Sequence, residues 1–550
     1  MDIKNFLKQN SFSALMHTKS SKYHGLSDES NNVIQLITGL ESSEGTLLLS
    51  PNKSALFVDG RYLLSAKCCV DQEKFEILDL KKRGIIQWIK KNIPSNSCIA
   101  YDPEFYTHWD MDFFKDNLKA YNFVTVNLKF LFGIATPKQI LRIHELKDAK
   151  TSKEKIDDAQ KIIDNNGLDA YLVCDPCTVA WLLNIRDFSR KYVPVVEGYL
   201  LITKDHSSTL YANSANEVNF SRCLVKSEND LQKDLNSFGC VGIDKGETPS
   251  HLNHGNFIHI QNPFELAKAV KNSHEIEQIK KTAKKDSMAL INFLHWFNTK
   301  VGKISELEAA EKILYFRQLQ DGFMGESFET ISAADEHAAM AHYAPSAASN
   351  KIVENILLLD SGGQYKYGTT DITRTICLKN PTEEQKLFYT LVLKGHIALA
   401  SAKFPAGTTG AQLDSLARQF LWRYSSNYDH STGHGIGYAL DVHEGPCAVS
   451  FHSGVPLQAG MVLSNEPGYY RENGFGIRLE NMMLTLEEAN GFLSFETISL
   501  VPFDAKFIQR EMLNAEENSW LKAYHNKIVS SAELQDDVLA WLNEYVEFYV

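Results

Sequence analysis

The sequence predicts an α/β protein of three domains, in which two related N-terminal α/β domains precede a mixed α+β domain. Three observations indicate this. Short apolar runs alternate with helical stretches up to about residue 140. A glycine-led hairpin pattern occurs twice in the first half of the chain. A long amphipathic helix pattern followed by strand-like runs begins near residue 267.

The composition is that of a globular protein. Of the 550 residues, 44% are hydrophobic and 23% are charged, which excludes extended disorder. The formal net charge is -12 and no block is rich in lysine or arginine, so we expect neither nucleic acid nor a membrane as partner. No apolar run approaches the roughly 18 residues of a transmembrane helix. Residues 1–16 lack the apolar core of a signal peptide, and we therefore expect a cytoplasmic protein.

The first two domains are predicted to cover residues 1–150 and 151–265. A polar, lysine-rich segment from Glu145 to Gln160 places the boundary between them. Gly45–Asp59 reads GTLLLSPNKSALFVD and Gly198–Ala212 reads GYLLITKDHSSTLYA. Each is a glycine, an apolar strand, a polar turn and a second apolar strand, which is typical of a β-hairpin. This comparison favours two domains of related design, although the identity is slight enough for chance.

The third domain is predicted to cover residues 266–550. It opens with an amphipathic helix whose apolar positions recur near helical spacing: Ile276, Ile279, Ala283, Leu290, Phe293 and Phe297. Strand-like runs such as ENILLLDSG and GFGIRLENMMLTL follow. The tail, residues 500–550, returns to helix with one apolar stripe, made of Leu534, Val538, Trp541, Leu542 and Tyr545. We expect that stripe to pack on the body of the protein rather than on a second subunit.

Cys174 and Cys177 form a C-x-x-C motif, one of the features that could carry metal or redox chemistry. There is no second pair at the spacing of a zinc site. The motif follows the apolar run AYLV, whereas a redox pair is expected to open a helix. We predict two structural cysteines at the end of a strand.

Acids and histidines gather in the third domain where strands are expected to end. Asp360 closes the run ILLLD, and Asp371 follows eleven residues later in GTTDITRT. Glu466 lies in SNEPGYY, and Glu480 follows fourteen residues later in GIRLEN. The segment between these pairs, DHSTGHGIGYALDVHEGP, holds three histidines: His430, His434 and His443.

This ordered set of acids and histidine favours a metal site. A carboxylate at the end of an apolar strand is costly to bury unpaired, and several together repel one another. A pair of divalent cations removes both costs, and an imidazole can complete the shell. Each acid taken singly is better explained as a cap of a turn or helix, and GHGIG lacks the Lys-Ser/Thr of a phosphate loop.

The motifs LLLDSGGQYKYGTTDITRT, STGHGIGYALDVHEGP, SNEPGYY and FGIRLEN resemble the metallopeptidases of the pita-bread fold. More closely, their order and spacing resemble the Xaa-Pro aminopeptidases (aminopeptidase P), in the long, three-domain form. HYAP at His342–Pro345, VDGRYLLSA and EENSWLKAYHNKI extend the likeness over nearly the whole chain. The resemblance implies creatinase-like N-terminal domains, a pita-bread catalytic domain and a homodimer.

The resemblance also implies a set of metal ligands. Asp360 would hold one metal, His434 and Glu466 would hold the second, and Asp371 and Glu480 would bridge both. In this family the cofactor is a pair of divalent cations, usually Mn2+. Zn2+ or Co2+ could occupy the same oxygen-rich site.

The implied reaction is attack of a metal-bridging hydroxide on the peptide bond before proline, in short peptides with proline in second position. Glu466 would take the proton of the water and pass it to the leaving nitrogen. His443 and His342 would hydrogen-bond the developing oxyanion, and His430 would line the substrate site. Arg478 lies two residues before Glu480, so on a strand it shares a face with that ligand. We expect it to steady the carboxylates rather than form a plain surface ion pair.

Two departures from the family pattern stand out. Ser431 replaces a glycine in HSTGHG and would be strained if that position needed a positive φ. The loop 333–341 is unusually charged: Asp335, Glu336 and His337 are expected at the surface, although they could alter access to the pocket.

Three alternative functions are less favoured by the sequence. A prolidase, which acts on Xaa-Pro dipeptides, is shorter and lacks the additional domain. A methionine aminopeptidase normally lacks the N-terminal domains. A non-catalytic, metal-free binding module would have lost ligands, and here all five are present.

Overall fold

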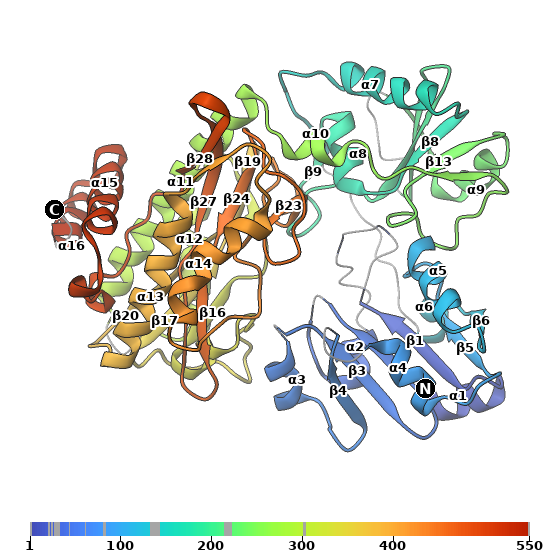
Figure 1. Cartoon of the computed structure of the whole chain (residues 1–550), viewed down its shortest axis with the longest axis horizontal. Coiled ribbons are helices and arrows are strands. Elements are labelled where there is room, and N and C mark those ends of the chain that lie inside the picture. Colours follow the sequence, from blue (N-terminus) through green and yellow to red (C-terminus); the bar gives the residue numbers. More distant parts are fainter. Residues whose placement is uncertain are drawn as a thin grey trace. The chain divides into compact units, whose positions relative to one another are not determined.

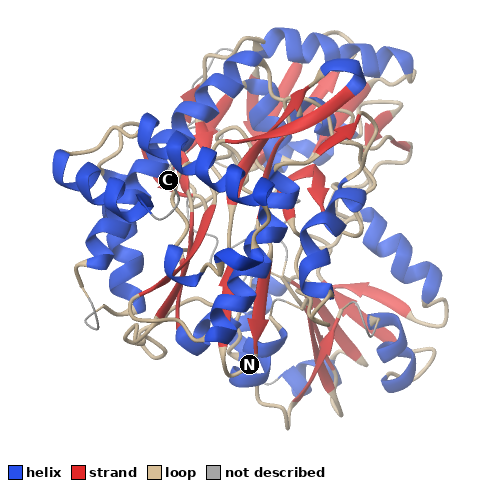
Figure 2. Ribbon diagram, turned by 60° about the vertical axis from the view of Figure 1, so that its left-hand side comes forward, coloured by secondary structure: helices blue, strands red, loops and turns tan. Residues whose placement is uncertain are grey.

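The computed structural model describes residues 3–19, 23, 26, 33–42, 44–60, 62–80, 84–132, 143–213, 223–300 and 304–547. They form two compact units, one of residues 1–189 and 195–264, the other of residues 190–194 and 265–550. Helices and strands alternate in both (Figure 2), which confirms the predicted mixed α/β class. Within these described ranges no helix is long and apolar enough to cross a membrane.

The first unit begins with a six-stranded sheet in the order β4-β3-β2-β1-β5-β6 (Figure 1). Its strands are β1 (Ala14–Thr18), β2 (Thr46–Leu49), β3 (Ser54–Val58), β4 (Phe75–Asp79), β5 (Cys98–Tyr101) and β6 (Asn122–Thr125). The helices between them are α1 (Ile3–Gln9), α2 (Val33–Thr38), α3 (Leu63–Cys69), α4 (Ile85–Asn92), α5 (His108–Asn117) and α6 (Leu128–Phe132). The central strand β1 is antiparallel to β2 and parallel to β5.

The same unit contains a second six-stranded sheet, in the order β12-β11-β10-β8-β13-β14. Its strands are β8 (Ala170–Val173), β10 (Gly198–Thr203), β11 (Ser208–Ala212), β12 (Leu224–Ser227), β13 (Val241–Ile243) and β14 (Phe257–His259). The accompanying elements are α7 (Ser152–Asn165), α8 (Pro176–Leu183), α9 (Leu231–Leu235), the 3-10 turn η2 (Glu228–Asp230), and the pair β7 (Ile143–Glu145) and β9 (Ile185–Asp187).

The two sheets share one topology. In each, the central strand pairs antiparallel with one neighbour and parallel with the other, and the two hairpins, β2–β3 and β10–β11, lie where the sequence predicts them. The outer strands are added in parallel in both sheets. This equivalence supports our proposal of two related domains, divided near residue 150.

Cys174 immediately follows β8, as predicted. Cys177 lies in the first turn of α8, so its predicted place at a strand end was wrong. Asp175 caps that helix, because its carboxylate accepts hydrogen bonds from the backbone N–H groups of Cys177 and Thr178. Neither cysteine takes part in a disulfide, and both are buried. Burial raises the pKa of the Cys174 thiol, which makes it unreactive.

The second unit packs helices around curved sheets. Its helices are α10 (Glu265–Ala269), α11 (Ser273–Asn298), α12 (Glu306–Gln318), α13 (Glu383–Ala400), α14 (Gly410–Trp422), α15 (Ala515–Ser531) and α16 (Asp536–Val546). One sheet has the order β16-β17-β20, from β16 (Ile331–Ala334), β17 (Ile356–Ser361) and β20 (Ile372–Cys377). A six-stranded sheet, β21-β28-β27-β24-β22-β23, is built from β21 (Lys403–Pro405), β22 (Gly433–Gly435), β23 (Glu444–Val449), β24 (Val462–Asn465), β27 (Asn481–Glu487) and β28 (Phe492–Thr497).

Smaller elements complete this unit. A three-stranded sheet and a hairpin comprise β15 (Phe323–Glu326), β18 (Gly363–Tyr365), β19 (Gly368–Thr369), β25 (Gly468–Arg471) and β26 (Phe475–Arg478). The short 3-10 turns are η3 (Asp335–Ala339), η4 (Ala489–Gly491), η5 (Ala505–Phe507) and η6 (Arg510–Met512).

Helix α11 follows the predicted apolar stripe. Asn272 and Glu275 form a capping box at its start. All the predicted stripe positions are buried except Ile276, which is half-buried. The tail stripe also packs on its own unit: Val538 and Leu542 are buried in the core, with Trp541 and Tyr545 against it.

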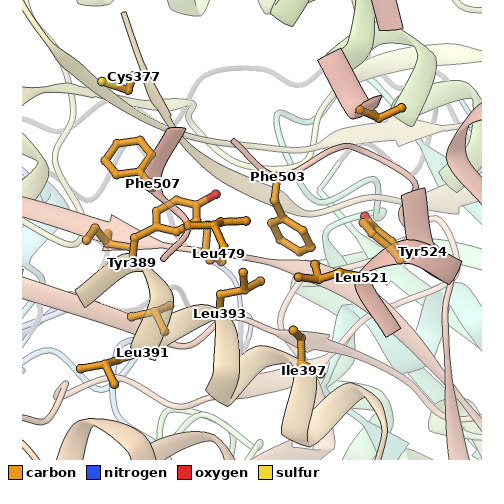
Figure 3. Close-up of a cluster of buried hydrophobic side chains, with 14 of the residues drawn as sticks. Cys377, Tyr389, Leu391, Leu393, Ile397, Leu479, Phe503, Phe507, Leu521 and Tyr524 are labelled. Carbon is orange, nitrogen blue, oxygen red and sulfur yellow. The ribbon is translucent and has the colours of Figure 1, made fainter. Parts of the chain in front are cut away.

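One large core cluster lies among α13, α15, the strand ends and η5, and Figure 3 shows part of it. The rings of Tyr389 and Phe507 stack with centroids 4.6 Å apart. Leu479, which is fully buried in this cluster, immediately precedes Glu480. Close packing around Leu479 therefore holds one of the predicted metal ligands in place.

Candidate metal centre

Two acids of the site come from one hairpin. β17 and β20 are antiparallel, and Asp360 of β17 lies opposite Thr373 of β20. Asp371 immediately precedes β20. Both aspartates are buried, at 8% and 4% exposed, so each needs a partner that offsets its charge.

The histidine and the two glutamates come from the six-stranded sheet and its edge. His434 lies in β22, Glu466 follows β24, and Glu480 lies between β26 and β27. A Cβ on Gly433 would come within 2.0 Å of the Ser464 carbonyl oxygen, and one on Gly435 within 2.2 Å of that of Glu444. The glycines of GHG are therefore required for the close approach of the strands that flank His434.

The structure brings these side chains together. One ligand atom from each of Asp371, His434 and Glu480 lies within 4.8 Å of the others. His434 Nε2 lies 3.4 Å from Asp371 Oδ2 and 3.5 Å from Glu466 Oε1. Residues more than 100 positions apart in the sequence thus form one cluster of donors.

Burial and mutual repulsion shift the acids of this cluster. Burial raises the pKa of Asp371 well above its usual value, and the charges of Asp360 and Glu466 raise it further. The pKa of Glu480 is also raised, mainly by burial and next by the charge of Asp371. A raised pKa favours the protonated acid, whereas a bound cation favours the ionised one.

The residues present fit a pair of divalent cations. Asp360 Oδ1 and Asp371 Oδ1 are buried and have no hydrogen-bond partner. An orphaned carboxylate oxygen in a protein interior is rare, and coordination of a metal is one of its explanations. Oxygen donors with one imidazole suit manganese, zinc or cobalt.

A hydrogen-bond network surrounds the cluster. Arg478 Nη2 lies 2.6 Å from Asp360 Oδ2, its Nε donates to Thr373 Oγ1 at 3.2 Å, and its Nη1 donates to the Tyr470 hydroxyl at 2.7 Å. Thr373 Oγ1 donates to a Glu480 oxygen at 2.7 Å. Arg478 is 2% exposed, so a surface ion pair is excluded.

The sequence reasoning missed Tyr470 and Thr373. Tyr470 belongs to the SNEPGYY motif, and its hydroxyl lies 2.8 Å from His430 Nε2. Burial raises the pKa of Tyr470 to about 12, so the hydroxyl stays protonated and can donate a hydrogen bond to His430 Nε2. Thr373 follows Asp371 by two residues, and this same-face spacing was the available signal.

The pocket histidines lie in different settings. The His443 ring packs on that of His434, with centroids 4.3 Å apart. His430 Nδ1 lies 3.8 Å from Glu466 Oε2. His342 lies half-buried in the turn that follows η3.

The charged side chains of the loop 333–341 differ in exposure. Asp335 accepts hydrogen bonds from the backbone N–H groups of residues 354–356, and His337 Nδ1 lies 2.7 Å from Glu306 Oε1. Both residues are half-buried, and their side chains hold the loop to its own unit. Glu336 is exposed, as expected, and pairs with Lys351.

Ser431 does not strain its loop. It is absent from the described residues that take a positive φ, so serine is acceptable at this position. The displacement of His430 that a positive φ would have caused does not arise.

Three family models match successive parts of the chain. Residues 277–487 match Metallopeptidase family M24, residues 135–275 match the Creatinase/Prolidase N-terminal domain, and residues 491–548 match the C-terminal region of peptidase M24. A probable Xaa-Pro aminopeptidase P of Sordaria macrospora is 33% identical over 90% of this chain and 88% of its own. The chain belongs to metallopeptidase family M24.

Within that family, this metallopeptidase groups with the Xaa-Pro aminopeptidases, which confirms the resemblance read from its motifs. The Xaa-Pro aminopeptidase of Caenorhabditis elegans is 31% identical over 93% of this chain and 91% of its own. A crystal structure of the X-prolyl aminopeptidase from that organism, described as a cytosolic enzyme with a di-nuclear active site, superposes with a TM-score of 0.92. It is 29% identical and covers 97% of this chain and 95% of its own, so the M24 unit has the pita-bread fold.

A prolidase structure matches only part of this metallopeptidase. The prolidase from Pyrococcus horikoshii has a TM-score of 0.54 and is 26% identical. It covers 64% of this chain but 99% of its own. The extra third of the chain agrees with the long, three-domain form.

Proposed function

We propose that this chain is a metal-dependent aminopeptidase that releases the N-terminal residue from short peptides with proline in second position. The observation that carries the proposal is the cluster of Asp371, His434 and Glu480, whose ligand atoms lie within 4.8 Å of one another. An X-prolyl aminopeptidase structure matches 97% of the chain that contains this cluster. The family indicates the class of reaction, and the cluster provides side chains that could bind the metals.

Five residues would hold the metals. Asp360 would bind one cation, His434 and Glu466 the other, and Asp371 and Glu480 would bridge both. We propose Mn2+, with Zn2+ or Co2+ as substitutes, because most donors are oxygens. When bound, such a pair lowers the pKa of a shared water and polarises the peptide carbonyl.

The remaining groups would move protons and hold the substrate. Glu466 would accept the proton of the attacking water and return it to the proline nitrogen as the bond breaks. His443 and His342 would donate hydrogen bonds to the carbonyl oxygen as negative charge develops. His430, held by Tyr470, would line the substrate site. Arg478 would fix the orientation of Asp360.

An Xaa-Pro bond needs a dedicated site. It lacks the N–H that most peptidases bind, and the proline ring fixes the backbone. A site that accepts the ring and anchors a free N-terminal amine can cleave it. Prolidase activity is the less favoured alternative, because the P. horikoshii prolidase structure matches only 64% of this chain.

We also propose a cytoplasmic homodimer. The cytosolic location of the C. elegans enzyme supports the cytoplasmic location. The family resemblance supports the homodimer. Light scattering on the purified protein tests the dimer directly, and a monomer at micromolar concentration would refute it.

The function is tested with chelated enzyme, with and without added Mn2+, on three substrates: Arg-Pro-Pro, Ala-Pro and a proline-free tripeptide. We expect metal-dependent release of arginine from the first, little turnover of the dipeptide and none of the third. D371N, which removes a predicted bridging ligand, serves as the inactive control. Preference for Ala-Pro would indicate a prolidase, and no cleavage by folded, metal-loaded protein would refute catalysis.

A further inference from the structure

A second group of charges lies behind the candidate site and takes no part in the proposed reaction. Glu444, at the start of β23, contacts two lysines: Lys268 Nζ lies 3.3 Å from its Oε2, and Lys271 Nζ contacts its Oε1. The three side chains are 1–5% exposed. We call this group the lysine clamp.

Such a group is costly to bury. Moving a charge out of water carries a penalty of several kcal/mol, which a buried partner offsets only when the geometry is good. Apolar side chains of similar volume would fill the same space with less penalty. Burial of the clamp is therefore weak evidence for a role in stability, and its place in the chain suggests a different role.

The clamp lies next to a predicted catalytic group. Glu444 is buried whereas its neighbour His443 is exposed, so the two side chains leave the chain on opposite sides. Glu444 pairs across the sheet with Gly435, the residue after His434. A fixed Glu444 therefore determines where the His443 ring lies relative to His434, whose ring centroid is 4.3 Å away.

The lysines come from a well-anchored segment. Lys268 lies in α10, which packs on β23, and Lys271 follows it. The backbone N–H of Lys271 donates to the Gly460 carbonyl at 3.1 Å, and Val270 bridges to Met461. The cations thus have fixed positions from which to hold Glu444.

The other end of the same loop is held independently. Gln364 Nε2 donates to the Leu440 carbonyl at 2.7 Å, and the Leu440 N–H donates to Thr369 Oγ1 at 3.2 Å. Both contacts precede His443 in the chain. The loop is therefore fixed upstream by neutral groups and downstream by the clamp.

We propose that Lys268, Lys271 and Glu444 are positioning residues, which hold His443 where it can donate to the carbonyl oxygen of the substrate. This inference rests on the proposed function, because it assigns His443 its role in that reaction. It adds a determinant of the turnover rate that lies outside the metal ligands and the pocket.

The kinetic test compares K271M and K268M in the wild-type and H443A backgrounds, using Arg-Pro-Pro and saturating Mn2+. K268M removes the longer contact, at 3.3 Å, and keeps the closer Lys271–Glu444 pair, so it disturbs folding least. We expect each lysine variant to lower kcat roughly 10-fold with little change in KM, because the oxyanion contact forms mainly in the transition state. In the H443A background the same changes should cause no further loss, since the clamp acts through His443.

K394M is the matched control. Lys394 Nζ pairs with Glu517 Oε2 at 2.5 Å, with side chains 12% and 9% exposed, between α13 and α15. It should lower stability with kcat unchanged. If K394M lowers kcat as much as K271M does, or if the K271M loss persists in H443A, the clamp has only a structural role and the proposal is overturned.

A second readout does not depend on activity. Histidine 13C NMR of the chelated protein, with the His443 resonance assigned by its loss in H443A, reports the setting of that ring. K268M or K271M should shift or broaden this resonance, and K394M should leave it unchanged. An unmoved His443 resonance in folded K271M overturns the clamp whether or not the protein cleaves Arg-Pro-Pro. Failure of wild-type cleavage alone would count against the proposed function instead.

Discussion

Arg478 and Asp360 form a buried ion pair across 118 residues of sequence, with Nη2 2.6 Å from Oδ2. Asp360 lies on one hairpin of the catalytic unit and Arg478 on another. The same guanidinium also binds Thr373 and Tyr470, and Tyr470 contacts His430. It therefore connects a predicted metal ligand, Asp360, to a predicted pocket histidine, His430. The neighbouring charges raise the pKa of Arg478 despite its burial, so it stays a cation.

Replacement of this arginine should weaken metal binding. R478K keeps the charge but cannot donate to Asp360, Thr373 and Tyr470 together. We expect the affinity for Mn2+ to fall by about 10–100-fold, the usual range for groups that orient metal ligands. Chelator competition measures this. R471K, which alters an exposed ion pair with Glu384, is the control. Unchanged affinity in R478K would show that Asp360 is oriented without it.

Metal binding should release protons and raise stability. In the metal-free protein the raised pKa values of Asp371 and Glu480 favour their protonated forms at neutral pH, and a cation displaces those protons. Calorimetry in two buffers of different ionisation enthalpy counts the protons released. Excess metal at 100 times the Kd should stabilise the fold by about 2.7 kcal/mol. D371N should release fewer protons, and binding without proton release would contradict the raised pKa values.

Ser431 and Gly433, two small residues that precede His434, should differ sharply in how well the protein tolerates their substitution. S431G restores the usual family residue, and because Ser431 has no positive φ we expect activity within about twofold and a stability loss under about 1 kcal/mol. G433A would place a Cβ 2.0 Å from the Ser464 carbonyl oxygen, so it should cost about 1–3 kcal/mol or more and displace His434. Thermal melts and Arg-Pro-Pro hydrolysis compare the pair. Equal tolerance of both changes would refute this geometry.

Acid should destabilise the fold through a buried neutral histidine. Burial lowers the pKa of His525 from 6.5 to about 3. The folded state therefore resists a proton that the unfolded state accepts below about pH 6.5, and stability present at pH 8 is lost as the pH falls towards 3. At pH 5 the loss is about 2 kcal/mol for this group.

Denaturant unfolding of wild type and H525Q at pH 8 and pH 5 checks this. Glutamine does not titrate, so H525Q should lose less stability than wild type between the two pH values. The buried His396, whose pKa is also lowered to about 3, remains in both proteins and cancels in the comparison. Parallel losses in the two proteins would show that His525 does not titrate as described.

Much of the architecture could be predicted because its signals are local. The apolar stripes of α11 and the tail, and both N-terminal hairpins, follow from side-chain periodicity within single segments. The family was evident from short motifs whose order is preserved. The loop around Asp335 and His337 could not be placed in this way, since its partners, Glu306 and residues 354–356, lie on other elements.

By itself, the sequence determined the mixed α/β class, the related N-terminal hairpins, the family and the residue types of a metal site, since each depends on local spacing or on the order of motifs. Only the tertiary structure decided which side chains meet. The pairing of β17 with β20 and of β22 with β24 brings Asp371 within 3.4 Å of His434. Packing around Leu479 and the hydrogen bonds of Arg478 and Tyr470 then fix their orientation. Those contacts join residues that lie far apart in the chain, and no local pattern encodes them.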